Sequence, residues 1–339
     1  MFFLGIDIAK ATFDVALLSE DGHPKCKVFA NTPDGFAQLL RWLEQHLVRR
    51  DTLHACLEST GVYGNALAHF LYHQGCQTVS VVNPAATAAL TAAFAKSQLA
   101  RNKTDKTDAI RIARYAQALR PAAWTPPAPE IAYLQALSRR RDALLQMRTM
   151  ESNRLETAPL GDPATAQPIA ESIHTVIDLL DAQIASIEKQ MHDHIDQTPS
   201  LRERRDLLDS IPGIAETTAT ALLAEMPDIT AFADAPTLAA FVGLTPRQKE
   251  SGSSIRGRSR LSKMGSARIR KALYWPAITA MRHNAAVKAL RTRLLARGKD
   301  QRAIRGAAMR KLLHIVYGVL KSGKPFDASI ALASGGSVA

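Results

Sequence analysis

Residues 2–18 read FFLGIDIAKATFDVALL, and this stretch decides the fold. Two apolar runs lie on either side of Ala9–Thr12, a pattern typical of two β-strands joined in a hairpin. The first run contains one acidic residue, Asp7. A carboxylate in a buried strand is costly unless it is paired or binds a cation, so Asp7 is the first candidate functional residue.

Further strands and helices follow the hairpin in a regular order. Residues 25–30 predict a third strand, and a short apolar strand over 52–57 stops at Glu58. The remaining elements expected in this region are helices over 36–48, 63–75 and 105–119 and a buried strand over 77–82. Strands in series that then alternate with helices predict an α/β layer fold with a mixed sheet.

The middle of the chain reads as two long helices. Four prolines in residues 121–129 predict an extended connector before the first helix, over 131–157. Prolines and a glycine between 159 and 168 are expected to break the chain before the second, over 169–196. Its apolar residues step by three or four and form one stripe: Ile173, Val176, Leu180, Ile184, Ile187, Met191 and Ile195. The pair is typical of a long α-hairpin or coiled coil that serves as a spacer or dimer contact, and core packing within one chain fits the stripe equally well.

These patterns predict four regions. An α/β domain covers 1–125, a helical coiled-coil linker covers 126–200, a mainly helical domain covers 201–328, and a disordered tail covers 329–339.

Charge is unevenly distributed along the chain. Residues 246–324 contain 21 Lys or Arg and two acids, within a total net charge of +12. A segregated basic segment favours a polyanion partner, and nucleic acid is the first candidate; a solvated basic surface is the alternative. The three cysteines are far apart, and we find neither a signal peptide nor an apolar run long enough to span a membrane. A reduced, cytoplasmic compartment is expected.

Four acids are candidate metal ligands. Asp7 and Glu58 belong to predicted strands, and Asp105 and Asp108 share one face of a predicted helix start. Carboxylates suit Mg²⁺, which prefers oxygen ligands and supports phosphoryl transfer. The alternative for Asp105 and Asp108 is an acidic first turn that offsets the helix dipole.

The N-terminal motif has a rival interpretation. GIDIAKATFDVALL also looks like the first phosphate loop of actin-like sugar kinases and chaperone ATPases. Those proteins need further Gly-rich loops, and we find none between Gly75 and Pro246, which argues against an ATPase.

Two C-terminal segments indicate nucleic-acid contact. Residues 208–225 have the form of a helix-hairpin-helix, in which Pro212, Gly213 and Ile214 form the turn. Backbone N–H groups in such a turn bind phosphate without reading sequence; an ordinary helical turn is the alternative.

The second segment, residues 241–277, places Ser251, Ser253 and Ser254 in a Gly-rich loop next to cations. Guanidinium groups around a hydroxyl are suited to phosphodiester attack; a phosphate clamp with no covalent role is the alternative. The candidate nucleic-acid-binding cations are Arg101, Lys103, Arg247, Lys249, Arg256, Arg258, Arg260, Lys263 and Arg268.

Taken together, the motifs resemble those of a known family. GIDIAK, LESTGVYG, VVNPA, RNKTDKTDA, SIPGI, FVGLTPRQKESGSSIRG and YGVLKSGKPFD occur in this order over about residues 3–328. The chain thereby resembles the DEDD-type insertion-sequence transposases, which have a RuvC-like nuclease domain, a C-terminal transposase domain and a guiding bridge RNA.

The resemblance implies specific roles. It implies an RNase H-like first domain, Mg²⁺ held by Asp7, Glu58, Asp105 and Asp108, and Ser251 as a nucleophile that forms a covalent phosphoserine–DNA intermediate. The implied partners are a structured noncoding RNA, double-stranded donor and target DNA, and further copies of the chain in a dimer or tetramer. Two other functions remain open: a metal-dependent nuclease in which Ser251 only binds phosphate, and a non-catalytic helix-hairpin-helix binding protein.

Overall fold

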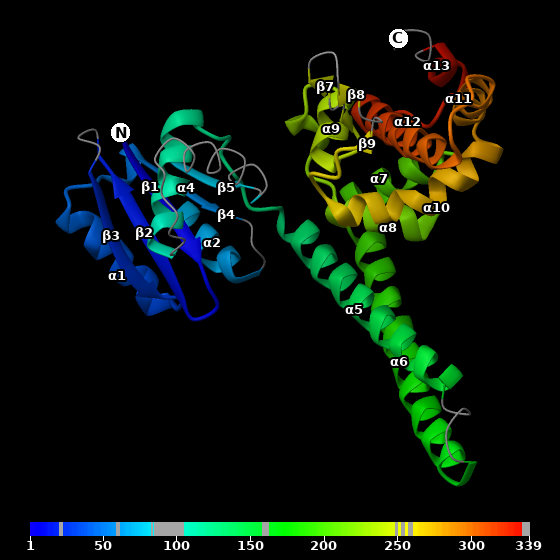
Figure 1. The fold of residues 1–339 in the computed structure, drawn as a ribbon, viewed down its shortest axis with the longest axis horizontal. Coiled ribbons are helices and arrows are strands. Elements are labelled where there is room, and N and C mark those ends of the chain that lie inside the picture. Colours follow the sequence, from blue (N-terminus) through cyan, green and yellow to red (C-terminus); the bar gives the residue numbers. More distant parts are fainter. Residues whose placement is uncertain are drawn as a thin grey trace. The chain divides into compact units, whose positions relative to one another are not determined.

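The hairpin at the N-terminus lies in a five-stranded mixed sheet. Strands β1 (Phe2–Ile8) and β2 (Thr12–Leu18) pair antiparallel, β3 (Pro24–Ala30) extends the sheet antiparallel to β2, and β4 (Leu53–Glu58) and β5 (Thr78–Val82) extend it in parallel on the other side. The order β3-β2-β1-β4-β5 (Figure 1) agrees with the predicted mixed α/β fold and is compatible with an RNase H-like domain.

This computed structural model describes residues 1–19, 23–58, 62–82, 84, 105–157, 163–247, 250–251, 255–256 and 260–333. They divide into two compact units, Met1–Pro126 and Pro127–Ala339, and each is described by itself. The long middle helices belong to the same unit as the C-terminal helices, although the sequence indicated a separate linker.

Helices cover both faces of the sheet. Helices α1 (Pro33–Gln45) and α2 (Asn65–His73) pack over one core, which includes Leu4, Ile6 and Phe13. Helix α4 (Asp105–Leu119) covers the opposite face. Short 3-10 turns η1 (Arg50–Thr52) and η2 (Val62–Gly64) precede β4 and α2.

Helix α1 begins earlier than the apolar spacing indicated. Its N-cap is Thr32, whose Oγ1 accepts a 3.3 Å hydrogen bond from the Gly35 N–H, and Pro33 follows directly. A capping hydroxyl followed by proline is a favoured helix start, so local capping sets the boundary.

In the second unit, helices α5 (Pro129–Thr157) and α6 (Pro163–Gln197) form a long antiparallel hairpin (Figure 1). Ion pairs Arg141–Glu188 and Arg148–Asp181 connect them. The buried members of the predicted stripe are Leu180, Ile184, Met191 and Ile195. These four residues therefore pack within the chain, and Val176, at 39% exposure, does not.

Pro168 does not end a helix as predicted, because it lies inside the first two turns of α6. A proline costs most in a helix interior, where it removes an N–H bond and clashes with the carbonyl four residues earlier. This close to the N-terminus, few intrahelical bonds are affected, so the helix continues through it.

The C-terminal part packs around α12 (Gln301–Ser322), which has ten buried residues. Its other elements are α7 (Pro199–Asp209), α8 (Glu216–Glu225), η4 (Ile229–Ala231), α9 (Ala235–Val242), α10 (Ala267–His283), α11 (Ala285–Ala296) and α13 (Ala328–Ala333). Thus residues to Ala333 are helical, where a disordered tail from 329 was predicted. Among the described residues, no helix is both long and apolar enough to cross a bilayer.

Two short β-pairs interrupt these helices. Strand β6 (Pro246–Arg247) pairs with β9 (Arg260–Leu261), and β7 (Glu250–Ser251) pairs with β8 (Ile255–Arg256). They occupy the predicted serine segment.

Candidate functional site

Asp7 and Glu58 lie at the carboxyl ends of adjacent parallel strands. The register pairs Ile6 of β1 with Leu57 of β4, so the two acids occupy equivalent positions one residue further on. Since side chains alternate along a strand, Asp7 shares a face with Phe3, and Glu58 shares one with Cys56. Phe3 and Cys56 both pack in the core under α4. The two carboxylates therefore face the side of the sheet that α4 covers.

Gly5 brings α4 unusually close to this face. A Cβ at Gly5 would lie 2.1 Å from the Ala109 carbonyl oxygen and 2.2 Å from the Ala113 amide nitrogen. Only glycine fits such a contact between helix and strand backbones. Because Ala109 directly follows Asp108, the contact brings the acidic first turn of α4 to the strand that carries Asp7.

The electrostatics of Asp7 reflect this arrangement. The pKa of Asp7 is raised from 3.8 to about 6, first by burial and then by the neighbouring carboxylates of Asp108, Asp105, Glu58 and Asp14, in that order. All four predicted acids thus gather in one place, although Glu58 is far in sequence from the others. Like charges held this close disfavour ionisation unless a cation compensates them.

The two helical acids differ in their surroundings. Asp105 is exposed, whereas Asp108 is half-buried and its Oδ1 lies 2.7 Å from Nη1 of Arg111, one turn along α4. This ion pair fixes Asp108 in the first turn. An acidic first turn also suits the helix dipole, so both interpretations of these acids fit the helix.

The acids do not form a tight cluster of metal ligands. Within the part of the chain that is described, no group of three or more His, Cys, Asp or Glu side chains is arranged to hold a metal ion. The four-acid metal site therefore stays a prediction. The candidate cations Arg101 and Lys103, just before α4, lie outside the described residues.

Asp14 is an acid that the sequence analysis missed. It pairs with Asp7 across the β1–β2 hairpin, and burial, followed by the charge of Asp105, raises its pKa above the usual value. The turn predicted at Ala9–Thr12 contained the signal, because a hairpin centred there places residues 7 and 14 opposite each other.

Asn31 was also missed. Its Nδ2 donates to the Ala9 carbonyl at 3.1 Å and to the Tyr63 carbonyl at 3.2 Å. Ala9 lies in the turn after Asp7, and Tyr63 lies in η2, which follows Glu58. One side-chain amide therefore connects the two loops that leave the acidic edge of the sheet.

In the second unit, the segment predicted to be a helix-hairpin-helix contains the turn between α7 and α8. Gly213 has φ +107°, and a Cβ there would lie 2.9 Å from both the Cβ and the amide nitrogen of Ala280 in α10. Ile211 and Ile214 are buried. The glycine is therefore explained by packing against α10.

The start of α8 is acidic. Glu216 occupies its first turn, and its Oε1 lies 2.6 Å from Nδ1 of His192 on α6. A carboxylate at this position competes with a phosphate for the helix N-terminus. Phosphate contact by Pro212, Gly213 and Ile214 stays a prediction.

Ser251 lies in β7, where its backbone pairs with Ile255 of β8. Arg256 and Arg260 lie in β8 and β9, and only the backbone of these residues is described. The other predicted residues of the loop, Lys249, Ser253, Ser254 and Arg258, lie outside the described residues. The nucleophile assignment therefore stays a prediction.

The candidate cations that flank the serine loop are better defined. Arg247 and Lys263 are exposed. Arg268, on α10, lies 3.6 Å from Asp142 and 3.8 Å from Glu225.

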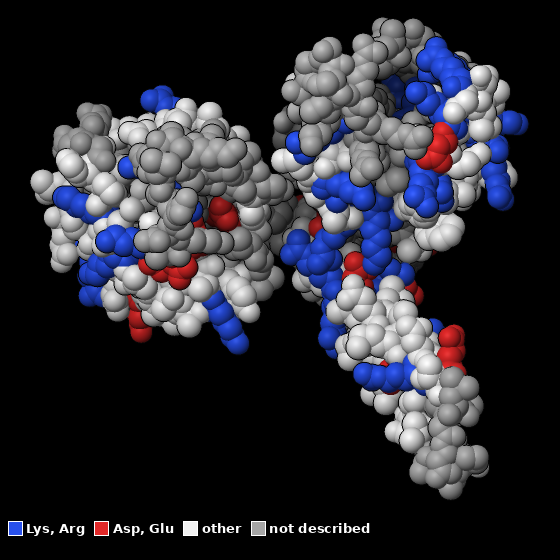
Figure 2. Space-filling model, in the orientation of Figure 1, with Lys and Arg blue, Asp and Glu red and all other residues white. Residues whose placement is uncertain are grey.

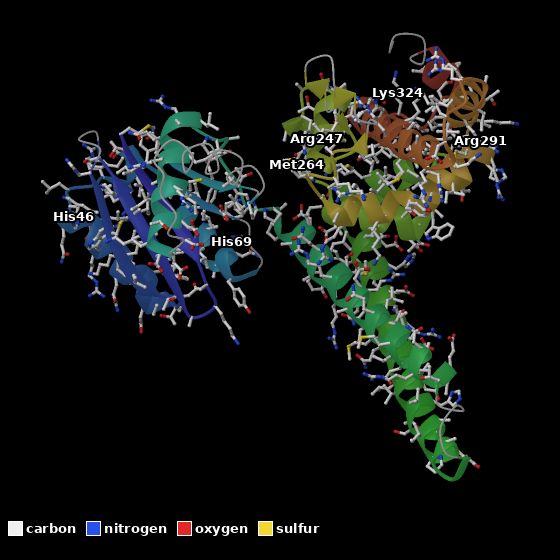
Figure 3. All side chains as sticks on the ribbon, in the orientation of Figure 1. His46, His69, Arg247, Met264, Arg291 and Lys324 are labelled. Carbon is white, nitrogen blue, oxygen red and sulfur yellow. The ribbon has the colours of Figure 1, made fainter. Side chains whose placement is uncertain are left out.

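Basic side chains gather over the C-terminal helices of the second unit (Figure 2). Arg291 on α11 and Lys324 after α12 are exposed, and both extend from the surface (Figure 3). A surface of this sign attracts the phosphate backbone of nucleic acid.

A mixed α/β unit with neighbouring carboxylates, followed by a basic helical unit, suits an enzyme that acts on nucleic acid. Comparison with known families agrees. A DEDD model of the IS110 type, described as "Transposase", matches residues 4–158, and a model described as "Transposase IS116/IS110/IS902 family" matches residues 205–291. The chain belongs to the IS110 family of DEDD transposases, and it is therefore a DNA-acting enzyme.

Its relatives include gene-inverting proteins and a transposase. The chain is 35% identical over 330 residues to the pilin gene-inverting proteins of Moraxella bovis and Moraxella lacunata, covering 97% of this chain and 98% of each relative. It is 26% identical over 212 residues to the transposase for insertion sequence element IS1111A of Coxiella burnetii, covering 56% of this chain and 57% of that one.

Proposed function

We propose that this transposase cuts and rejoins DNA with two sets of residues: a Mg²⁺ site made of Asp7, Glu58, Asp105 and Asp108, and a serine nucleophile, Ser251. The observation that carries the proposal is the gathering of the four acids, from two strand ends and one helix start, on a single face of the sheet.

The donor set fits a hard divalent cation. All four side chains offer carboxylate oxygens, the ligands that Mg²⁺ prefers. The raised pKa of Asp7 reports burial and repulsion among these acids, and a cation would offset both. When bound, the ion would act as a Lewis acid on the scissile phosphate. Arg111 orients Asp108 within the first turn of α4 through their 2.7 Å ion pair.

The serine step conserves phosphoester bonds. Ser251 Oγ forms a bond to phosphorus while the bond from phosphorus to a deoxyribose oxygen breaks, and the hydroxyl proton passes to the departing oxygen or to solvent. Attack by the freed DNA hydroxyl of a partner strand reverses the step and restores the serine. Guanidinium groups of Arg256 and Arg260 would stabilise the charge that develops on the phosphate.

The relatives' names support an exchange of this kind. A protein that inverts a gene must rejoin every strand that it cuts. A covalent intermediate stores the bond energy for that rejoining. We further propose that a structured noncoding RNA selects donor and target DNA by base pairing, by analogy with other RNA-guided systems, and that two or four copies of the chain assemble on the DNA.

The acid site is tested with Asp7→Asn. This variant should lose strand cleavage in Mg²⁺ by at least about a hundred-fold, because a ligand to the proposed ion is removed, while thermal unfolding shows an intact fold. Asp51→Asn is the matched control, since Asp51 is an exposed acid in η1 that pairs with Arg49, and it should cleave like wild type. Full cleavage by Asp7→Asn would remove these acids from the mechanism.

The nucleophile is tested by trapping the covalent adduct on a nicked target and separating it on a denaturing gel. Wild type should shift the DNA, and Ser251→Ala should lose the shift while still binding DNA. Ser253→Ala and Ser254→Ala are the matched controls and should keep it. A covalent adduct formed by Ser251→Ala would show that a neighbouring residue is the nucleophile. No adduct in any protein, with cleavage retained, would favour a metal-dependent nuclease without a covalent intermediate.

A further inference from the structure

An exposed indole lies on the outer face of α10. Trp275 is 71% exposed, whereas Trp42, in the sheet core, is 6% exposed. Exposed positions at helical spacing on either side of Trp275 are occupied by Arg268, Lys271 and Arg282. Because residues three or four apart lie on one helix face, the indole lies in one row with these three basic side chains.

The indole is held at one edge. The ring of Tyr274 lies 5.4 Å from it at an interplanar angle of 83°. Tyr274 is itself fixed, because its hydroxyl accepts a 2.8 Å hydrogen bond from Nη1 of Arg305 on α12. An edge-to-face contact limits the rotamers of the indole, while most of its surface stays open to solvent.

The neighbouring cations remain accessible to a further anion. Arg268 and Lys271 share Asp142 at 3.6 and 3.5 Å, Arg268 also lies 3.8 Å from Glu225, and the two basic side chains are 47% and 67% exposed. Exposed pairs of this kind contribute little, so phosphates can replace the carboxylate at small cost. The segment that contains α10 has 21 Lys or Arg against two acids, which complements a polyanion.

We propose that Trp275 stacks on a base of an unpaired DNA strand whose phosphates contact Arg268, Lys271 and Arg282. Aromatic side chains beside cations bind single strands in this way with little sequence preference, because every base has a π-face. In a duplex the base faces are already stacked on one another, so an exposed indole selects unpaired DNA. Strand exchange by a transposase opens base pairs and so creates such a strand.

The position on α10 suits this role. The helix begins shortly after β9, which closes the serine segment, and Trp275 lies eight residues past the first helical residue, Ala267. At 1.5 Å per residue this is about 12 Å along the helix axis. The indole thus lies on the first helix after the serine segment in the chain.

The experiment measures how the full chain binds a short single-stranded oligodeoxynucleotide. A metal chelator is present so that no DNA is cleaved. Binding is followed by tryptophan fluorescence and by the fluorescence anisotropy of a labelled strand. Wild-type fluorescence should be quenched. Trp275→Phe should lose most of the quenching but keep its affinity, and Trp275→Ala should bind single strands about ten-fold more weakly while duplex affinity changes little. Tyr133→Ala is the control, since Tyr133 is 49% exposed on α5, and it should bind like wild type.

Three results would overturn the proposal. The first is that Trp275→Ala binds single-stranded DNA as tightly as wild type. The second is a loss of affinity only for RNA of the same sequence, which would assign the indole to an RNA partner. Alternatively, Trp275→Ala could change the self-association seen by light scattering and leave DNA binding intact, which would assign the indole to a protein interface. Because no cleavage is measured, failure of the Ser251 mechanism would not affect the outcome.

Discussion

Asn31 carries no charge, yet its amide connects the turn after Asp7 to the turn after Glu58. Carboxylates that act together on one phosphate must keep their spacing, and a small displacement of a catalytic group costs rate. We therefore regard Asn31 as a positioning residue for the acidic site. Sequence patterns do not reveal it, because a hydrogen bond over 32 residues leaves no periodic signal.

Asn31→Ala should lower the rate of single-turnover cleavage about ten-fold, because the loops beyond the two acids are no longer connected. The matched control is its neighbour Thr32→Ala, which removes the N-cap of α1 at a cost of about 1 kcal/mol but leaves the amide in place. Both variants are compared by thermal unfolding, by cleavage rate and by hydrogen exchange of residues 8–12. If Asn31→Ala and Thr32→Ala lowered the cleavage rate equally, Asn31 would contribute only to the stability of the fold.

At the scale of elements, long periodic segments could be predicted and short or context-dependent ones could not. The hairpin, β4, β5 and α4 follow from alternation or helical spacing. The strands β6 to β9 are two residues each, too short for any periodicity. Likewise, the approach of α4 to Gly5 depends on which helix covers which face of the sheet. The four acids could therefore be found in the sequence, but only resemblance to a family indicated that they meet.

Helix α12 contains a partly buried histidine, His314, whose protonation links the stability of the fold to pH. Burial, and then the charges of Arg310 and Lys311, lower the pKa of His314 from 6.5 to about 4, while Asp234 acts in the opposite direction. Within the described residues, the buried Nε2 of His314 has no hydrogen-bond partner. The folded chain therefore resists protonation of this imidazole.

The sign of the pH effect follows from linkage. The unfolded chain binds the proton more tightly, so the stability contributed by neutral His314 is present above pH 6.5 and is lost as the pH falls toward 4. Urea unfolding across this window should show a loss of up to about 3 kcal/mol. His314→Gln should flatten the profile, and His174→Gln, at an exposed position on α6, should not. An unchanged profile in His314→Gln would contradict the assignment.

At the scale of the whole molecule, the chain separates its charges. The acidic site lies in the unit Met1–Pro126, and the basic segment lies in the unit Pro127–Ala339. The second unit therefore provides most of the attraction for nucleic acid, while the first provides the carboxylates. The basic segment and its polyanion partner could be predicted from composition. The identity of that partner could not, because phosphates of DNA and RNA attract cations alike.

The proposed RNA partner is tested on the complete protein. Recombination between defined donor and target sites should require the RNA, because backbone contacts alone do not select a sequence. Protein freed of RNA should still bind DNA, with an affinity that falls steeply with added salt, but should not recombine the sites. Restoring the RNA should restore recombination, whereas an RNA with a scrambled guide loop should not. Site-specific products formed by protein and DNA alone would contradict the guide role.

The repulsion around Asp7 also bears on how this enzyme can evolve. An acid whose pKa is raised to about 6 is ionised at neutral pH against the preference of its surroundings, so replacing it with a neutral side chain of similar shape stabilises the fold. Under the proposed mechanism, such a substitution of Asp7 benefits folding and harms transposition. Copies of the gene that no longer transpose would be expected to lose this acid early, and a selection for thermostability alone would drive the enzyme toward a well-folded, inactive binding protein.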